Sequence, residues 1–314
     1  HPTPPHLCRP HHYRAEWRPR RLAGEENPVR MPYSDTFIDS LILEDCPYGD
    51  LTTASLGIGA RMGRMRFYPR AGQCTVSGTE PAARILSRCG LTVESRMEDG
   101  LPAEGKPCLL SCTGRADDLH RAWKIAQNVL EYMCGIATRA RDMVSAARRG
   151  RPDIAVAATR KNFPGAKLLS LAAATDGGCI VHRAGLSESL LFFDRHIAFL
   201  DGEDRLETFA RILPSIRRAA PEKRVICEAD SVETALRFAR AGADGVQLDK
   251  FSPSDLARMV NALRAVSPNL LVLAAGGINA GNAEDMAAAG PDVLVTSWIY
   301  SGRPQDIRVT METL

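Results

Sequence analysis

Residues 153–165 read Asp153-Ile154-Ala155-Val156-Ala157-Ala158-Thr159-Arg160-Lys161-Asn162-Phe163-Pro164-Gly165. The first part of this stretch is small and apolar with β-branched members, which predicts a buried strand. Thr159, Arg160 and Lys161 then stand where that strand should end, and the pair His182-Arg183 follows about twenty residues later. Cations gathered at the carboxyl end of a barrel-type strand predict a site for an anionic substrate.

The chain after residue 151 alternates between strand-like and helix-like segments. We expect strands at 154–158, 224–227, 245–248, 270–274 and 292–296, and amphipathic helices at 231–241, 254–266 and 283–289. The last four strands end near Glu228, Asp249, Ala275 and Ser297, a spacing typical of βα units. No Gly-x-Gly-x-x-Gly follows a first strand, so the sequence favours an α/β barrel over a doubly wound open sheet.

The region before the barrel has a different pattern. Short strand-like runs at 63–68, 73–77, 91–95 and 107–113, with one helix at 81–89, indicate a smaller α+β domain, and a long amphipathic segment at 117–149 follows it. We therefore expect a leader at 1–30, an N-terminal α/β domain at 31–126 and a barrel domain at 127–302. A C-terminal tail follows at 303–314, and packing against the N-terminal domain is one arrangement open to it.

Composition sets the first 30 residues apart. They hold six prolines, four of the seven histidines and six arginines with almost no apolar pattern, which predicts a disordered basic leader. The leader lacks an apolar core region, so it is not a secretory signal, and Met31 is a candidate start. Its six arginines against three glutamates account for the whole net charge of +3. A neutral body with 6% aromatic residues argues against nucleic-acid binding.

The cysteines and the apolar runs of the chain indicate its cellular compartment. The nine cysteines form no Cys-x-x-Cys motif, and Cys108 and Cys112, the closest pair, have no nearby His to complete a zinc site. Free thiols in a reducing cytoplasm are the interpretation we favour. No apolar run approaches the roughly 20 residues needed to cross a bilayer, so we expect no membrane association.

Six short motifs occur in a fixed order along the chain. They are Glu44–Thr53, Gly135–Thr138, Thr159–Gly165, His182–Glu188, Leu248-Asp249 and Gly276-Gly277-Ile278. Together they resemble the quinolinate (nicotinate-nucleotide) phosphoribosyltransferases, from about Met31 to the C-terminus, and especially a relative associated with molybdenum transport. The resemblance implies an N-terminal α/β sandwich followed by an α/β barrel, the type II phosphoribosyltransferase fold. It also implies a homodimer with shared active sites, and a link to molybdenum metabolism.

The resemblance implies a reaction that the residues can be tested against. Phosphoribosyl transfer moves ribose 5-phosphate from phosphoribosyl pyrophosphate to a nitrogen nucleophile, so the site needs cations and Mg²⁺ near pyrophosphate and carboxylates near the ribose. Arg160, Lys161, Glu228 and Asp249 are the candidate catalytic residues, and the two carboxylates are the candidate Mg²⁺ ligands. The candidate substrate-binding residues are Lys124, Thr159, Arg160, His182, Arg183, Phe193, Ala275, Gly276, Gly277 and Ser297.

Some motif residues have a structural interpretation instead. Glu44, Asp45 and Asp50 are expected to shape a turn and cap a helix, and Gly135–Thr138 to serve packing at a domain junction. A surface-pair interpretation of His182-Arg183 and a solvated-loop interpretation of Glu228 remain open.

Four positions depart from the family pattern. Lys124 stands where those enzymes have an Arg that reaches a substrate carboxylate from across the dimer. Phe193 replaces a Lys, Leu273 replaces a Glu, and Lys250 replaces an Asn. Because each unpaired buried charge costs several kcal/mol, the loss of a Lys disfavours a dicarboxylate, whereas Phe193 offers a flat face to a less charged aromatic acceptor.

The sequence is therefore compatible with three functions. The first is a phosphoribosyltransferase acting on an aromatic or heterocyclic nitrogen acceptor. The second is a genuine quinolinate phosphoribosyltransferase of NAD biosynthesis. The third is a catalytically silent anion-binding or regulatory protein, for which Leu273 and Lys250 are the motive.

Overall fold

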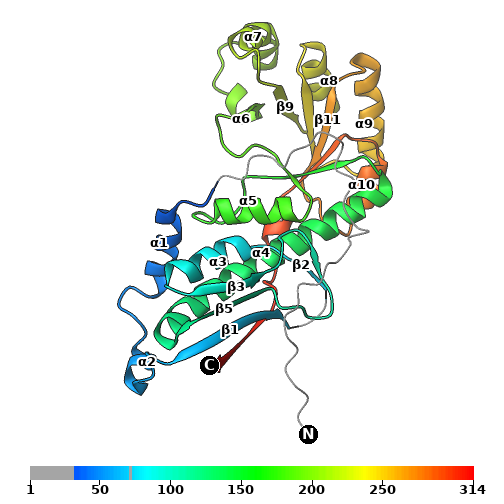
Figure 1. Cartoon of the computed structure of the whole chain (residues 1–314). Helices are drawn as coiled ribbons and strands as arrows, with labels where there is room; N and C mark the ends of the chain where they lie inside the picture. The colour runs from blue at the N-terminus through cyan, green and yellow to red at the C-terminus, as the bar shows by residue number, and fades with distance from the viewer. Residues whose placement is uncertain (1–31, 71–72) are drawn as a thin grey trace. The chain divides into compact units, whose positions relative to one another are not determined.

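The computed structural model describes residues 32–70 and 73–314, so the predicted leader at 1–30 lies outside the described residues. The chain forms two compact units (Figure 1). The first holds the described residues up to Thr138 together with 168–178 and 303–314, and the second holds 139–167 and 179–302. Helix α4 (Ala116–Gly150) runs unbroken through residue 126, where the sequence placed a domain boundary.

The first unit is built on a four-stranded antiparallel sheet in the order β13-β1-β5-β3. Its strands are β1 (Met62–Pro69), β3 (Thr92–Arg96), β5 (Leu110–Arg115) and β13 (Ile307–Thr313). Alternate residues of β1 are buried, among them Met65 and Phe67, as expected for a strand with one face on a core. The segment expected as a tail thus contains β13, which pairs with Gly63–Pro69 of β1.

Helices cover and extend this first sheet. Helix α3 (Thr79–Arg88) packs against β3 and β5, and α1 (Asp35–Asp45) packs against α3. Helix α2 (Leu51–Leu56) begins after Asp50, whose carboxylate accepts hydrogen bonds from the N–H groups of Thr52 and Thr53, so the predicted capping role of Asp50 is confirmed. A two-stranded ribbon, β2 (Cys74–Thr75) with β4 (Pro102–Ala103), and most of α5 (Lys167–Asp176) complete the unit.

The second unit is a seven-stranded sheet in the order β7-β6-β12-β11-β10-β9-β8, and each neighbouring pair is parallel. The strands are β6 (Ala155–Ala158), β7 (Ile180–Val181), β8 (Leu190–Phe192), β9 (Val225–Ala229), β10 (Gly245–Asp249), β11 (Leu271–Ala275) and β12 (Val293–Thr296). The predicted α/β fold class, a small N-terminal sheet domain with a C-terminal barrel-type parallel sheet, is confirmed.

Helices connect the strands of the second unit. They are α6 (Asp194–Ile197), α7 (Arg205–Ala219), α8 (Val232–Arg240), α9 (Pro253–Val266) and α10 (Ala283–Ala288). A 3₁₀ turn, η1 (Trp298–Tyr300), follows β12. Ser231 and Ser252 cap α8 and α9 through their hydroxyl oxygens, which accept from the N–H groups of Thr234 and Asp255.

The strand register decides which side chains share the inner face of this sheet. Gln247 is paired with Glu228 on β9 and with Leu273 on β11, and Phe193 is the next step of the β8–β9 register. Because partners in register project from the same face, these four side chains form one row across the sheet. Apolar residues dominate around them, in a cluster of Ala157, Leu191, Ile226, Leu273, Ala275, Val293 and Val295 against which Phe193 packs.

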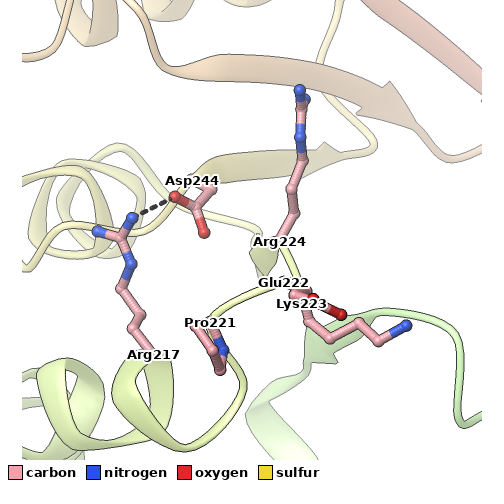
Figure 2. Close-up of a pocket in the computed structure, with 6 residues that line it drawn as sticks. All are labelled: Arg217, Pro221, Glu222, Lys223, Arg224 and Asp244. Atoms are coloured by element: carbon pink, nitrogen blue, oxygen red, sulfur yellow. Dashed lines mark hydrogen bonds and ion pairs between the residues drawn. The ribbon is translucent and has the colours of Figure 1, made fainter.

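Two Asp residues stabilise the amino-terminal edge of the same sheet through ion pairs and hydrogen bonds. Asp292 pairs with Arg264 through both carboxylate oxygens (2.6 and 2.7 Å) and accepts from the N–H of Val272 at 2.8 Å. Asp244 repeats the arrangement with Arg217 at 2.7 Å and the N–H of Val225 at 2.8 Å. Figure 2 shows the second pair beside a small pocket that Lys223 and Arg224 also line.

Two further observations concern the described residues. None of their helices is long and apolar enough to cross a membrane. Their eight cysteines are all free thiols, six of them buried.

Candidate functional site

The carboxyl edge of the parallel sheet carries most of the predicted site residues. Because all seven strands run the same way, their last residues meet at one edge. This edge holds Thr159 after β6, His182 after β7, Phe193 after β8, Glu228 within β9, Asp249 ending β10, Ala275 ending β11 and Ser297 after β12. The sheet thus gathers residues that lie up to 138 positions apart in the chain.

Arg160 and Arg183 form the cationic side of this edge. Burial lowers the pKa of the Arg183 guanidinium first, and the like charge of Arg160 lowers it further, so the two cations lie within electrostatic reach. Arg183 has a left-handed backbone (φ 51°) and donates from Nη1 to the carbonyl of Ser189 at 3.1 Å. The like charges of Arg160 and Arg183 repel each other, and a bound anion would relieve that repulsion.

The loop after β6 is held by its own hydrogen bonds. Thr159 Oγ1 accepts from the N–H of Lys161 at 3.2 Å, and the carbonyl of Thr159 accepts from Tyr300 Oη at 3.1 Å. Arg160 and Lys161 are both exposed, so their side chains project into solvent at the edge.

Glu228 forms the acidic side of the edge. Burial raises the pKa of this carboxyl first; a hydrogen bond from Gln247 lowers it, the charges of Asp249 and Asp194 raise it, and Lys161 lowers it. The hydrogen bond runs from Gln247 Nε2 to Glu228 Oε2 at 2.6 Å. The carboxylates of Glu228 and Asp249 therefore repel each other, and a cation between them would stabilise both.

The Asp249 carboxylate lies close to the backbone of Gly276. A Cβ on Gly276 would come within 2.6 Å of Asp249 Oδ1 and of the Lys250 nitrogen, and Gly276 has φ 90°, so glycine is required there. Lys250 is also left-handed (φ 64°), a conformation that Asn adopts more readily than Lys. Its Nζ lies 3.3 Å from Asp249 Oδ2.

Gly277 offers open backbone at the edge. Its φ is 72°, and a Cβ there would meet nothing within 4 Å. Asn282 Nδ2 donates to the carbonyl of Gly277 at 3.2 Å, and Thr296 Oγ1 donates to the carbonyl of Ile278 at 2.7 Å. These bonds fix the loop after β11 beside the end of β12, where Ser297 begins the 3₁₀ turn.

Phe193 forms an aromatic flank. Its ring is stacked on the imidazole of His196, with centroids 5.5 Å apart and an interplanar angle of 28°. The N–H of Phe193 donates to His196 Nδ1 at 3.0 Å. One side of the edge is thus aromatic and apolar, with Leu273 buried in the same cluster.

Gln247 is a residue that sequence reasoning missed. Its side chain is 95% buried (5% exposed) at the centre of the inner row, where apolar residues dominate. Gln247 Oε1 and His182 Nε2 are both buried and lack a hydrogen-bond partner. The signal in the sequence was a single amide in the strand Gly245–Asp249, but only the register shows that it faces inward.

One predicted site residue, Lys124, belongs to the first unit. Lys124 lies on α4, where its Nζ donates to Gln127 Oε1 at 2.8 Å and lies 4.9 Å from the centroid of the Trp123 ring. The side chain is exposed.

The carboxylates of Glu228 and Asp249 are the candidate ligands for Mg²⁺ at this edge. Within 32–70 and 73–314, no three His, Cys, Asp or Glu side chains converge as a complete metal site. Mg²⁺ in phosphate-transferring enzymes is commonly held by one or two carboxylates together with substrate phosphates and water. Glu228 and Asp249, whose charges repel, fit that mode of binding.

This chain belongs to the quinolinate phosphoribosyl transferase family. The family's C-terminal domain matches residues 136–310 and its N-terminal domain matches residues 50–134. Among individual proteins, the chain is 37% identical over 280 residues to the “Putative pyrophosphorylase ModD” of Escherichia coli O6:H1, covering 89% of this chain and 97% of that one. It is 43% identical over 258 residues to the protein of the same name from Rhodobacter capsulatus, covering 82% and 96%. The predicted family membership is confirmed.

More distant proteins share the fold. The human carboxylating nicotinate-nucleotide pyrophosphorylase is 28% identical over 267 residues, which cover 85% of this chain and 87% of that one. The solved structure of the nicotinate-nucleotide pyrophosphorylase from Francisella tularensis superposes with a TM-score of 0.80 at 19% identity, covering 92% of this chain and all of that one. The corresponding Ehrlichia chaffeensis structure gives a TM-score of 0.79 at 22% identity, with coverage of 90% and 100%.

Proposed function

We propose that this protein transfers ribose 5-phosphate from phosphoribosyl pyrophosphate to a nitrogen of an aromatic or heterocyclic acceptor, releasing pyrophosphate. The observation that carries the proposal is the division of one sheet edge into a cationic side, Arg160 and Arg183, and an acidic side, Glu228 and Asp249. A sugar that bears a phosphate and a pyrophosphate needs cations for its anions and carboxylates for its hydroxyls and its metal.

The reaction divides its charges in the same way. The acceptor nitrogen donates its lone pair to the anomeric carbon, and the bond from that carbon to the pyrophosphate oxygen breaks with its electrons leaving on pyrophosphate. Negative charge therefore grows on the leaving group, where Arg160, Lys161 and Arg183 would stabilise it. Glu228 and Asp249 would hold the ribose hydroxyls and Mg²⁺, which supplies further charge neutralisation when bound. The open backbone at Gly277 and the residues at Ala275 and Ser297 would receive the 5-phosphate.

The acceptor is proposed to be aromatic and to carry less charge than a pyridine dicarboxylate. Phe193 packs against the apolar cluster that includes Leu273, so this flank offers a ring face and methyl groups to the acceptor. A buried carboxylate without a cation on this flank would cost several kcal/mol. This argues against quinolinate, the acceptor that the family name suggests.

The working protein is proposed to be a cytoplasmic homodimer with shared sites. The site of one chain would be completed by Lys124 of the other, because Lys124 lies on the first unit and is exposed. A role in molybdenum metabolism is proposed from the family resemblance and from the ModD relatives.

Donor binding tests the proposal directly. Isothermal calorimetry of the wild type with phosphoribosyl pyrophosphate and Mg²⁺ should give saturable 1:1 binding, and Arg160→Ala should weaken it by about tenfold or more, since hydrogen bonds to charged groups contribute roughly 1.5 to 3 kcal/mol. Arg258→Ala, on helix α9, where the Arg258 side chain is 81% exposed and pairs with Asp255, is the control. Absence of donor binding by the wild type would favour the silent anion-binding protein.

The acceptor is tested by turnover. Heterocycles and aromatic amines are screened for pyrophosphate release in the presence of the donor. Quinolinate is included, and a kcat/KM of roughly 10⁴ M⁻¹s⁻¹ or more with it, within the ordinary enzyme range, would overturn the proposed acceptor class.

A further inference from the structure

Tyr300 links two loops of the carboxyl edge that the proposed function assigns to different parts of the donor. It is the last residue of the 3₁₀ turn η1, which begins directly after Ser297. Its Oη donates a hydrogen bond of 3.1 Å to the carbonyl of Thr159, which lies 141 positions earlier in the chain and directly before Arg160. A carbonyl oxygen accepts and never donates, so the phenol is the donor, and burial, which raises the pKa of Tyr300, keeps it protonated at neutral pH.

The phenol holds the peptide bond that leads into Arg160. The carbonyl of Thr159 and the N–H of Arg160 belong to one planar peptide unit, so a contact that fixes the carbonyl fixes the whole unit. The N–H of Thr159 donates to the carbonyl of Thr296 at 3.0 Å, and Thr159 Oγ1 accepts from the N–H of Lys161 at 3.2 Å. The hydrogen bond from Tyr300 therefore acts on the residue from which the two cations extend.

This hydrogen bond lies beyond the ladder of the sheet. Strand β6 ends at Ala158, whose register partner on β12 is Thr296, so the register ends one residue before Thr159. The two strands are paired without the phenol. Loss of the hydroxyl should therefore free the loop after β6 and leave the sheet intact.

The other end of Tyr300 belongs to the loops proposed for the 5-phosphate. The N–H of Tyr300 donates to the carbonyl of Ser297 at 3.1 Å. Thr296 Oγ1 accepts from the N–H of Trp298 at 3.0 Å and donates to the carbonyl of Ile278 at 2.7 Å, which joins η1 to the loop after β11. A phosphate bound by that loop and by Ser297 would therefore also restrain Tyr300.

We propose that Tyr300 is a positioning residue that couples the two anion-binding loops, so that a phosphate at the Ser297 loop orders Arg160 and Lys161 for pyrophosphate. An anion that orders η1 also orders the peptide before Arg160, and the second anion then has less of the chain to immobilise. Linkage makes the coupling reciprocal, so pyrophosphate favours the sugar phosphate by the same factor. The inference rests on the proposed function for the identity of the two anions, and it gives Tyr300 a role in selecting a donor that carries both.

The coupling is measured with the two halves of the donor. Calorimetry in the presence of Mg²⁺ gives the Kd of pyrophosphate without and with saturating ribose 5-phosphate, and the first value divided by the second is the coupling factor. The two anions also repel each other, but this repulsion is common to the wild type and the variant. Tyr300→Phe keeps the ring and removes the hydroxyl, so the coupling factor should be about threefold to tenfold larger in the wild type, the range expected for one hydrogen bond of ordinary strength.

Two comparisons show that the effect is specific. The affinity for ribose 5-phosphate alone should be the same in the wild type and Tyr300→Phe, as expected for a variant that folds normally. Tyr132→Phe, at a residue of α4 that is 60% exposed, is the control and should keep the wild-type coupling factor. Equal coupling factors in the wild type and Tyr300→Phe would overturn the inference.

Hydrogen–deuterium exchange of the full chain provides a second measurement. Saturating ribose 5-phosphate should slow exchange in wild-type peptides that cover residues 159–165, and peptides over the exposed residues 221–224, between α7 and β9, should not change. In Tyr300→Phe the slowing at 159–165 should be lost. Unchanged exchange at 159–165 in the wild type would contradict the coupling, and so would slowing that persists in Tyr300→Phe, because direct contact with the ligand would then be its cause.

The outcomes separate this inference from the proposed function. If the wild type binds neither half nor the whole donor, both fail. If the halves bind with a coupling that depends on Tyr300 but no acceptor gives turnover, the proposed function fails and the positioning role stands. If the donor binds and reacts while the coupling factors are equal, only the inference fails.

Discussion

Phe193 and His196 stack face to face at the end of β8, and the same Phe193 packs against the cluster that contains Leu273. The ring is thus fixed from two sides, by a hydrogen-bonded imidazole and by an apolar core. An aromatic group held in one orientation can stack on a substrate ring without losing further side-chain freedom. This relationship makes Phe193 the natural residue to test for acceptor recognition.

Phe193→Leu should raise the KM for the acceptor by about threefold to tenfold, because an aromatic pair contributes roughly 0.5 to 1.5 kcal/mol beyond its buried area. The KM for phosphoribosyl pyrophosphate should stay the same. Steady-state kinetics with the acceptor found by the pyrophosphate screen checks this expectation. Phe199→Leu, in the same segment but 90% exposed, is the matched control. Equal effects of the two substitutions would remove Phe193 from the acceptor site.

Glu228→Gln should stabilise the fold while abolishing turnover. The folded state raises the pKa of Glu228, so it binds this proton more tightly than the unfolded chain does. The free energy of unfolding therefore falls as pH rises from the unfolded-state value, near 4.5, through the raised folded-state value. A Gln cannot ionise, and its oxygen can still accept from Gln247.

The stability gain of Glu228→Gln over the wild type should therefore grow between pH 4 and pH 7, as measured by urea unfolding at each pH. Glu203→Gln, at an exposed position, is the comparison. If the difference in the free energy of unfolding between the variant and the wild type did not change with pH, ionisation of Glu228 would not destabilise the fold. A carboxylate kept at such a cost is typical of active sites.

Asp292→Ala should destabilise the protein by roughly 2 to 4 kcal/mol, since breaking a largely buried pair leaves a charge without its partner. The change removes both hydrogen bonds from Arg264 and the acceptor for the N–H of Val272. Denaturant unfolding measures the difference. Asp306→Ala breaks the pair with Arg70, in which the two side chains are 63% and 59% exposed, and should cost less than about 1 kcal/mol. A cost for Asp292→Ala no larger than this control would contradict a fastening role.

Lys124→Ala and Arg160→Ala should each be inactive alone and complement each other when mixed. If each site takes Lys124 from one chain and Arg160 from the other, random exchange of subunits should restore about a quarter of the wild-type activity. Activity after mixing, with sedimentation to confirm the dimer, checks the expectation. Mixtures that stay as inactive as the separate variants would place both residues in one chain's site or exclude Lys124 from it.

Strands of the parallel sheet that consist of a continuous apolar run could be predicted from the sequence. Expected strands at 245–248 and 270–274 are found at Gly245–Asp249 and Leu271–Ala275, because buried parallel strands carry continuous apolar side chains. Strands β7 and β8 were not predicted, since two or three residues are too few to show any period. Both are stabilised by pairing with a neighbour that is distant in sequence.

The candidate site was also only partly predictable from the sequence. Charged residues at strand ends, such as Arg160 and Asp249, are visible in a sequence because strand ends meet at one edge. Gln247 was missed, since an isolated amide in a strand faces either water or the interior, and only the pairing with Glu228 decides which. The left-handed backbone at Arg183 and Lys250 was also invisible, because neither residue type indicates a positive φ.

The pairing of β13 with β1 has a consequence for biosynthesis. Residues 62–69 leave the ribosome more than 230 residues before their partner strand, 307–313, has been made. During that interval one edge of β1 has no strand to bond with, and an unpaired edge is a template for association with other chains. The whole barrel sequence emerges in the meantime. A nascent chain of this protein should therefore depend on chaperones until its last seven-residue strand is released, and a C-terminal truncation should aggregate rather than merely lose activity.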